Sequence, residues 1–255
     1  MEFITLYWWR ILLSIVISYL LGSFSFAVIF TKLSKNEDVR TMGSGNAGFT
    51  NVLRSVGVVP AIFTFIFDCL KGVIAILLTA YIFNLQFDSA AISELTNTVR
   101  FEYLTYGKYL AAVFCVFGHS FPIFFGFKGG KGITTMAGIL LILDWKFLAL
   151  VLGTWIIFFV MTKIISVGSV MAAATISVWN FVVTYFFHYK SALDAPAVKR
   201  LSYSLVELDE PLKVRYVVVT SCIIFFIAVF VLIMHRENIK RLIRGEEKKI
   251  KAKKN

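Results

Sequence analysis

Charged residues, histidines and cysteines are all scarce in this 255-residue chain. Only 16% of the residues are Asp, Glu, Lys or Arg, whereas a soluble domain carries about 25%. The hydrophobic fraction is 58% and the mean hydropathy is +0.80. This composition excludes an ordinary soluble domain. It predicts a single membrane domain over residues 1–255, with no room for a second.

The sequence also lacks the patterns that hold metals or disulfides. Three cysteines lie in apolar stretches without any CxxC spacing: Cys69, Cys115 and Cys222. Cysteines in such positions are usually small buried side chains. Three scattered histidines and the absence of HExxH predict no metal site.

Long apolar stretches recur along the chain, and a transmembrane helix needs about 20 such residues. We count seven, including a short fourth one: Ile11–Phe30, Ser55–Phe83, Tyr109–Phe127, Ile133–Leu143, Phe147–Thr162, Ile164–Phe187 and Tyr216–Met234. The first stretch is longer than the roughly 7–15 residues of a signal-peptide core, so no cleavable signal is expected. The predicted fold class is an all-α integral membrane protein with seven transmembrane helices.

The distribution of Lys and Arg predicts the orientation. With the N-terminus outside and seven crossings, the inside segments carry sixteen of these residues and the outside segments nine. The positive-inside rule favours this arrangement, with a basic cytoplasmic tail over 236–255. A basic stretch directly after an apolar run is a topology signal, so no nucleic-acid partner is expected. The outside segments 84–108 and 188–215 mix both signs and are predicted to be solvated connectors.

Glycines and small polar residues crowd the first inside loop. Gly43, Gly45 and Gly48 form GxGxxG, but no βαβ unit surrounds them, which excludes a dinucleotide site. Backbone amides in such a loop can converge on an anion. The side chains able to assist are Ser44, Thr50, Asn51 and Arg54. The alternative is a flexible loop with a helix cap at Thr50 or Asn51.

A second glycine-rich loop directly precedes the short apolar stretch. Gly129, Gly130 and Gly132 surround Lys131, without the spacing of a P-loop. A short helix whose N-terminus points at an anion is a recurring device in membrane proteins. The alternative is an ordinary cytoplasmic turn marked by lysines.

Two oppositely charged residues interrupt the second apolar stretch. Asp68 and Lys71 are three residues apart and therefore share a helix face. Charges within a span are rare and usually paired or functional. We interpret them as a structural pair that positions the site. Mutual neutralisation near the membrane interface is the alternative.

Polar pairs also occur at the inside ends of the last two spans. Ser166 and Ser169 share one helix face, and His235 and Asn238 share another. Such serines usually support helix packing, and a histidine at a helix end is more often a satisfied interfacial residue. Both pairs are expected at the same membrane depth as the two glycine-rich loops. We therefore interpret them as parts of a functional site.

Together these clusters resemble the acyl-phosphate-dependent glycerol-3-phosphate acyltransferases of bacteria, the PlsY family. A motif of the form GSGNxGxTNxxRxxG runs from Gly43 to Gly57, and GHxxPxxxxFKGGKG runs from Gly118 to Gly132. A third motif, HxxNxxRLxxGxE, begins at His235, and DxxKG matches 68–72. The resemblance spans nearly the whole chain in the right order. It departs at Ser25 and at position 27, where relatives usually carry Pro and Gly.

The resemblance implies transfer of a fatty acyl group from acyl phosphate to glycerol 3-phosphate, the first acylation of phospholipid synthesis. It also implies seven transmembrane helices and an active site on the cytoplasmic side of the bacterial inner membrane. The expected catalytic residues are Ser44, Arg54, Lys131, His235 and Asn238. The expected substrate-binding residues are Gly43, Gly45, Asn46, Thr50, Asn51, Gly129, Gly130 and Ser169. The expected partners are the two substrates and membrane lipid, and no cofactor is expected.

The motifs that are missing fit that chemistry. Many other acyltransferases carry HxxxxD, whereas Phe124, Leu193 and Lys240 stand five residues after the three histidines. An acyl phosphate is already activated, so an acyl-enzyme is not needed, and we expect direct transfer. A transporter of organic phosphates and a membrane scaffold are the competing classes. A transporter would distribute polar residues toward the bilayer midplane, whereas these motifs cluster at one side.

Overall fold

The computed structural model describes residues 2–85, 90–191 and 208–249, and every regular element in these ranges is helical. Six helices or helix pairs of this part are long and apolar enough to cross a membrane. They are built from α1 (Glu2–Gly22), α4 (Val58–Phe83), α6 (Asn97–Ser120), α8 (Trp145–Thr162), α9 (Ile165–Val182) with its π-helical continuation η3 (Val183–Lys190), and α11 (Val214–Met234). The shorter elements are α2 (Phe26–Lys35), η1 (Val39–Thr41), α3 (Phe49–Ser55), α5 (Ala90–Ser93), η2 (Ile123–Phe125), α7 (Ile133–Leu143) and α12 (Arg236–Ile243).

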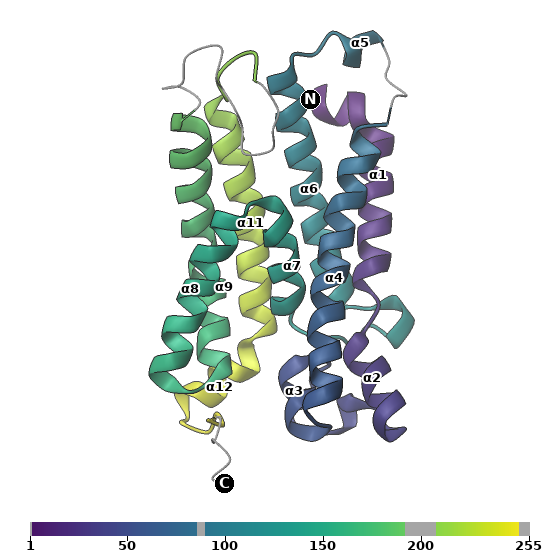
Figure 1. Ribbon diagram of the computed structural model, residues 1–255, viewed down its shortest axis with the longest axis vertical. Coiled ribbons are helices and arrows are strands. Elements are labelled where there is room, and N and C mark those ends of the chain that lie inside the picture. Colours follow the sequence, from purple (N-terminus) through teal and green to yellow (C-terminus); the bar gives the residue numbers. More distant parts are fainter. Residues whose placement is uncertain (1, 86–89, 192–207, 250–255) are drawn as a thin grey trace.

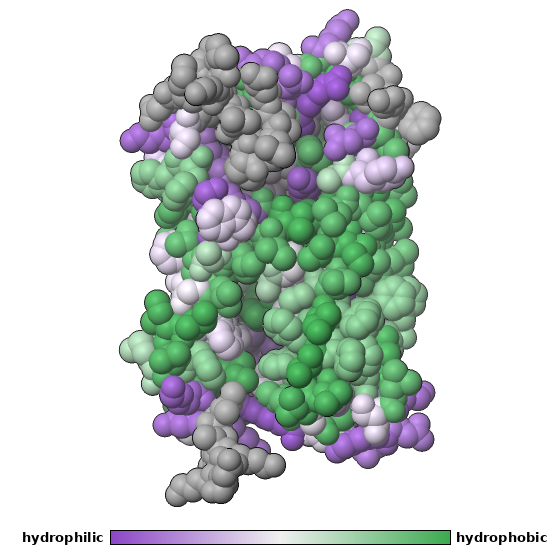
Figure 2. Space-filling model, viewed as in Figure 1, coloured by the Kyte–Doolittle hydropathy of each residue, from purple (hydrophilic) through white to green (hydrophobic). Residues whose placement is uncertain are grey.

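The long helices run along the longest axis of the molecule, as Figure 1 shows. Helix α1 begins near one end, and α2, α3 and α12 lie at the opposite end (Figure 1). We call the latter the α12 end. Figure 2 shows hydrophobic side chains covering the middle of the visible face and hydrophilic ones gathering at both ends. A broad apolar band between polar ends identifies an all-α integral membrane protein.

Glycines allow the long helices to approach closely. A Cβ added at Gly22 of α1 would lie 2.2 Å from the Cys115 carbonyl oxygen of α6. One added at Gly138 of α7 would lie 2.0 Å from the Cys69 carbonyl oxygen of α4. Membrane helices pack through such small residues because lipid provides little hydrophobic driving force between them. These contacts place α7 firmly against α4.

The first apolar stretch is not one continuous helix, contrary to the prediction for Ile11–Phe30. The chain is non-helical between α1 and α2, and the Ser23 hydroxyl donates to the Tyr19 carbonyl oxygen at 2.8 Å. The Phe24 carbonyl oxygen instead accepts from Lys71 Nζ at 2.8 Å. A tertiary contact with α4 therefore satisfies backbone polarity at the break, which hydropathy alone could not predict.

The predicted connector 84–108 was wrong in its second half, because α6 already begins at Asn97. Glu102 of this helix is fully buried and accepts from Arg215 Nε at 2.8 Å. The partner of Glu102 lies more than a hundred residues away in the chain. Sequence alone therefore predicted a solvated residue at this position. Of the other predicted connector, 188–215, residues 192–207 lie outside the described part.

Helix α7 is too short to cross a bilayer by itself. Its 11 residues span about 16 Å, roughly half of the apolar thickness of a bilayer. It starts after Gly132, whose φ of +87° favours glycine, and ends at Asp144. Asp144 caps α8 by accepting from the Lys146 backbone N–H at 2.7 Å. Each of the seven predicted stretches thus contains helix, and the start of α7 lies inside the protein.

Candidate active site

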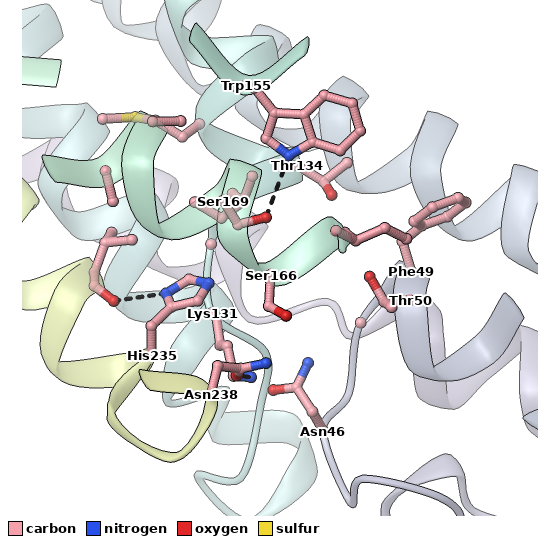
Figure 3. A pocket seen from close by; sticks show the side chains of 18 of the residues that line it. Asn46, Phe49, Thr50, Lys131, Thr134, Trp155, Ser166, Ser169, His235 and Asn238 are labelled. Carbon is pink, nitrogen blue, oxygen red and sulfur yellow. Dashed lines mark hydrogen bonds between the residues drawn. The ribbon is translucent and has the colours of Figure 1, made fainter. Parts of the chain in front are cut away.

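A cavity of about 780 Å³ lies between the α12 end and the interior formed by α7, α8, α9 and α11. Polar side chains line one part of it: Ser44, Asn46, Thr50, Arg54, Lys131, Ser169, His235 and Asn238. The other part is apolar, with Met136, Leu140, Leu152, Trp155, Ile176 and Ile227. In Figure 3, Thr50 and Asn46 approach the space from one side, and His235 and Asn238 from the other. The cavity can therefore hold a polar group and an apolar chain together.

Asn51 shapes the first glycine-rich loop from within. Its amide nitrogen donates to the carbonyl oxygens of Val39 and Met42 at 2.9 and 3.0 Å. Its Oδ1 accepts from the Ser44 backbone N–H at 3.0 Å. A Cβ at Gly43 would lie 2.4 Å from this oxygen, and the φ of Gly43 is +54°. The loop is thus braced by Asn51, with Gly43 making room for the brace.

Lys131 brings positive charge into the buried part of the cavity. Its ammonium group donates to Asn238 Oδ1 on α12. Burial, followed by the charge of Arg241, lowers the pKa of Lys131 to about 8. Arg54, by contrast, is exposed, and its Nη2 donates to the Lys248 carbonyl oxygen at 3.0 Å. Arg54 lies on α3 and Lys131 in the second glycine-rich loop, so the two cations reach the same cavity from different segments.

His235 presents an unprotonated ring nitrogen. Its Nδ1 lies 2.8 Å from the Val231 carbonyl oxygen, which can only accept, so Nδ1 carries the proton. The other nitrogen, Nε2, is then an acceptor, and in Figure 3 it points away from that carbonyl toward the serines of α9. Burial lowers the pKa of His235 to about 4, and the nearby charge of Lys131 acts in the same direction. This imidazole is therefore neutral at neutral pH.

Three residues outside the predicted site support its side chains. Glu247 accepts from Arg241 Nε at 2.7 Å and from Asn238 Nδ2 at 3.3 Å. Burial raises the pKa of Glu247, but the hydrogen bond from Arg241 and the positive charges of Arg241 and Arg54 together keep the pKa below its usual value. Trp155 Nε1 donates to Ser169 Oγ at 3.3 Å (Figure 3). Arg241 lies three residues after Asn238, a spacing that could have suggested it. No local pattern indicates Trp155.

The structure brings most of the predicted site residues to this cavity. Those on its wall are Gly43, Ser44, Asn46, Thr50, Asn51, Arg54, Lys131, Ser169, His235 and Asn238. Gly45, Gly129 and Gly130 do not line the cavity, and the last two pack against His119. The roles predicted for all thirteen stay predictions. In the described residues, no group of three or more His, Cys, Asp or Glu could hold a metal ion.

Fold and cavity define a class: a multi-pass membrane protein whose cavity fits an amphiphile with an anionic head. The chain belongs to the PlsY-type glycerol-3-phosphate acyltransferase family, whose sequence model matches residues 12–245. The glycerol-3-phosphate acyltransferase of Trichormus variabilis is 34% identical over 94% of this chain and 91% of its own. That of Coxiella burnetii is 33% identical over 94% and 98%.

Solved structures agree with this assignment. A crystal structure of PlsY, an integral membrane glycerol 3-phosphate acyltransferase, in its glycerol 3-phosphate form superimposes with a TM-score of 0.69 and 28% identity. The match covers 94% of this chain and 96% of that one. The lysophosphatidic acid form gives a TM-score of 0.65 and 26% identity, over 94% and 95%.

Proposed function

We propose that this protein transfers a fatty acyl group from an acyl phosphate to glycerol 3-phosphate, giving 1-acyl-glycerol 3-phosphate and phosphate. One observation carries the proposal: the cavity joins a cationic, amide-rich part to an apolar part. The reaction needs both, because two anionic heads and one fatty chain must be held together. Relatives of the PlsY type were solved in glycerol 3-phosphate and lysophosphatidic acid forms, which supports this assignment.

Glycerol 3-phosphate is assigned to the polar part. Arg54 and Lys131 supply the positive charges, and Arg54 can bind a phosphate through two parallel hydrogen bonds. Ser44, Asn46 and Asn238 add neutral donors around the same space. The acyl chain of the donor is assigned to the apolar part, between α7, α8 and α9. The donor phosphate then lies near the N-terminus of α7, whose free amides favour an anion.

The chemistry is direct transfer. The glycerol hydroxyl oxygen attacks the carbonyl carbon, the bond between that carbon and the phosphate oxygen breaks, and the hydroxyl proton passes to phosphate. Holding the two substrates in position supplies about 7–11 kcal/mol of the barrier reduction. Fixed donors that stabilise the oxyanion add to it. His235 carries its proton on Nδ1, so its Nε2 can accept a hydrogen bond from the glycerol hydroxyl and orient it.

No residue of the protein is acylated in this scheme. Cys69, Cys115 and Cys222 lie in long helices, and none of them lines the cavity. Among the described residues, no hydrogen bond links Ser44 to a histidine or an aspartate that could activate it. We therefore expect acyl-CoA and acyl carrier protein to be inactive as donors.

The protein is further proposed to form one domain in the bacterial inner membrane, with seven crossings and the α12 end in the cytoplasm. The basic residues of the α12 end support this orientation through the positive-inside rule. The polar residues of the predicted site line one cavity at the α12 end, which favours an enzyme at the membrane surface over a transporter, whose site would lie near the midplane.

The test uses purified protein and two measurements. Phosphate should be released only when acyl phosphate and glycerol 3-phosphate are both present, with sequential kinetics. Incubation with labelled acyl phosphate alone, followed by denaturation, should leave no label on the protein. Turnover with acyl-CoA as the only acyl donor would contradict the assignment of acyl phosphate as the donor. A labelled Ser, Cys or His peptide, discharged by glycerol 3-phosphate at a competent rate, would contradict direct transfer.

A further inference from the structure

A buried polar cluster lies behind the cavity where several elements meet. Lys71 of α4 is 2.8 Å from Asp68, and both side chains are at most 3% exposed. The same ammonium group donates to the Phe24 carbonyl oxygen at 2.8 Å. Its third neighbour is Nδ1 of His119 on α6, also at 2.8 Å. The Thr135 hydroxyl of α7 lies 3.2 Å from the same ring nitrogen.

These contacts determine the protonation of His119. An ammonium group can only donate, so Nδ1 of His119 accepts from Lys71. The ring proton of the neutral imidazole must then be on Nε2. The orientation of the ring is fixed as well, because Lys71 is itself held by Asp68 and by the Phe24 carbonyl.

The far edge of the ring supports the place where the two glycine-rich loops meet. The Gly130 backbone N–H donates to the His119 carbonyl oxygen at 3.1 Å. A Cβ at Gly130 would lie 2.2 Å from His119 Nε2 and 2.6 Å from the Ala47 carbonyl oxygen of the first loop. Gly130 is thus enclosed between the imidazole and the first loop, directly before Lys131. Neither Gly130 nor Ala47 lines the cavity, whereas His119 and Asp68 reach its wall.

We propose that His119, anchored by the Asp68–Lys71 pair, is a positioning residue that sets the distance between the two loops and thereby places Lys131. The inference rests on the proposed function, because it takes Lys131 to bind the phosphate of glycerol 3-phosphate. Asp68 and Lys71 hold the ring, the ring supports Gly130, and Gly130 leads to Lys131. A misplacement of about 1 Å in such a support costs about a hundredfold in rate.

Two conservative variants separate the two ends of the imidazole. H119N keeps an oxygen that accepts from Lys71 but loses the ring edge against Gly130. H119Q reaches Gly130 but leaves Lys71 without its third acceptor. H188N is the matched control, because His188 is equally buried at 5% exposed, bonds to Asp144 at 2.9 Å, and does not line the cavity. A cooperative thermal unfolding transition in each purified variant would show that the variant is folded.

We expect H119N to raise the KM for glycerol 3-phosphate and to lower kcat/KM by about 10–100-fold. We expect H188N to change the unfolding temperature and to leave both constants within about twofold of wild type. A double-mutant cycle of H119N with G130A should be non-additive, because both substitutions act on one contact. Wild-type constants in H119N, or an additive cycle, would overturn the positioning role. Failure of the proposed function is a separate outcome, since wild-type protein would then show no turnover.

Discussion

Arg54 and Lys131 carry positive charge to one cavity from different surroundings. Arg54 is exposed. Lys131 is more deeply placed, and its pKa of about 8 brings its titration close to neutral pH. The exposed cation can therefore attract and bind the substrate phosphate, whereas the charge of the buried one depends on pH.

Replacing Arg54 with Ala should weaken binding of glycerol 3-phosphate by about 1.5–3 kcal/mol, the scale of a hydrogen bond to a charged group. The expected readout is a higher KM in steady-state kinetics of folded protein. Arg244→Ala is the matched control, because Arg244 is also an exposed arginine at the α12 end but does not line the cavity. Equal constants in the two variants would disprove the phosphate role of Arg54.

The titration of Lys131 predicts a basic limb in the pH profile. The protonated lysine binds the phosphate dianion, so kcat/KM should fall as pH rises through about 8. A bound dianion favours the charged form, so kcat should hold to higher pH than kcat/KM. In Lys131→Arg the limb should disappear, because arginine stays charged. A profile that is flat to pH 9.5 in wild-type protein would contradict this assignment.

At the scale of elements, α7 connects the packing of the protein to the cavity. Its N-terminus follows Lys131 directly, and its body lies against α4. Any displacement of α7 along α4 would therefore move the start of the helix relative to the first loop. We therefore expect the close packing of α4 and α7 to hold the start of α7 in place at the cavity and also to stabilise the fold.

Gly138→Ala should consequently destabilise the protein by about 1–3 kcal/mol, the usual cost of overpacking. The new Cβ would lie 2.0 Å from the Cys69 carbonyl oxygen, a backbone atom that cannot move alone. Gly153→Ala on α8 is the matched control, since nothing lies within 4 Å of its Cβ. That variant should gain about 0.5–1 kcal/mol from helix propensity. Thermal unfolding in detergent compares the two, and equal midpoints would count against the α4–α7 contact.

At the scale of the whole molecule, the ends differ in chemistry. The α12 end carries the cavity with its cationic side chains, and α5 lies at the opposite end (Figure 1). Under the proposed function, a water-soluble phosphate substrate from the cytoplasm must reach the first of these ends. Orientation in the membrane is therefore a condition for function and not only a matter of insertion.

Single-cysteine variants can test this orientation. A membrane-impermeant thiol reagent applied to intact cells with a permeabilised outer membrane should label Glu94→Cys, next to α5. It should not label Arg244→Cys at the α12 end until the inner membrane is opened. Both positions are exposed, and the native cysteines lie in long helices. The reverse labelling pattern would refute the proposed topology.

Sequence by itself determined the helical membrane class and most of the polar residues around the cavity. Apolar stretches must form helices in lipid, because backbone groups find no other partners there. The glycine-rich loops and the His235 motif stood out because so many polar groups in short segments serve little purpose in a connector. We predicted that these segments lie close together because the expected topology places all of them at one membrane face.

Tertiary structure alone decided what depends on partners distant in sequence. Glu102 can be buried within a helix because it accepts from Arg215, and the break before α2 is tolerated because Lys71 donates to the Phe24 carbonyl oxygen. Asn51 proves to be the brace of its own loop, and Trp155 holds Ser169 without any motif around it. Hydropathy and motif spacing describe a residue and its chain neighbours. Whether a buried polar group has a hydrogen-bond partner depends on the folded molecule, because the partner can come from a distant part of the chain.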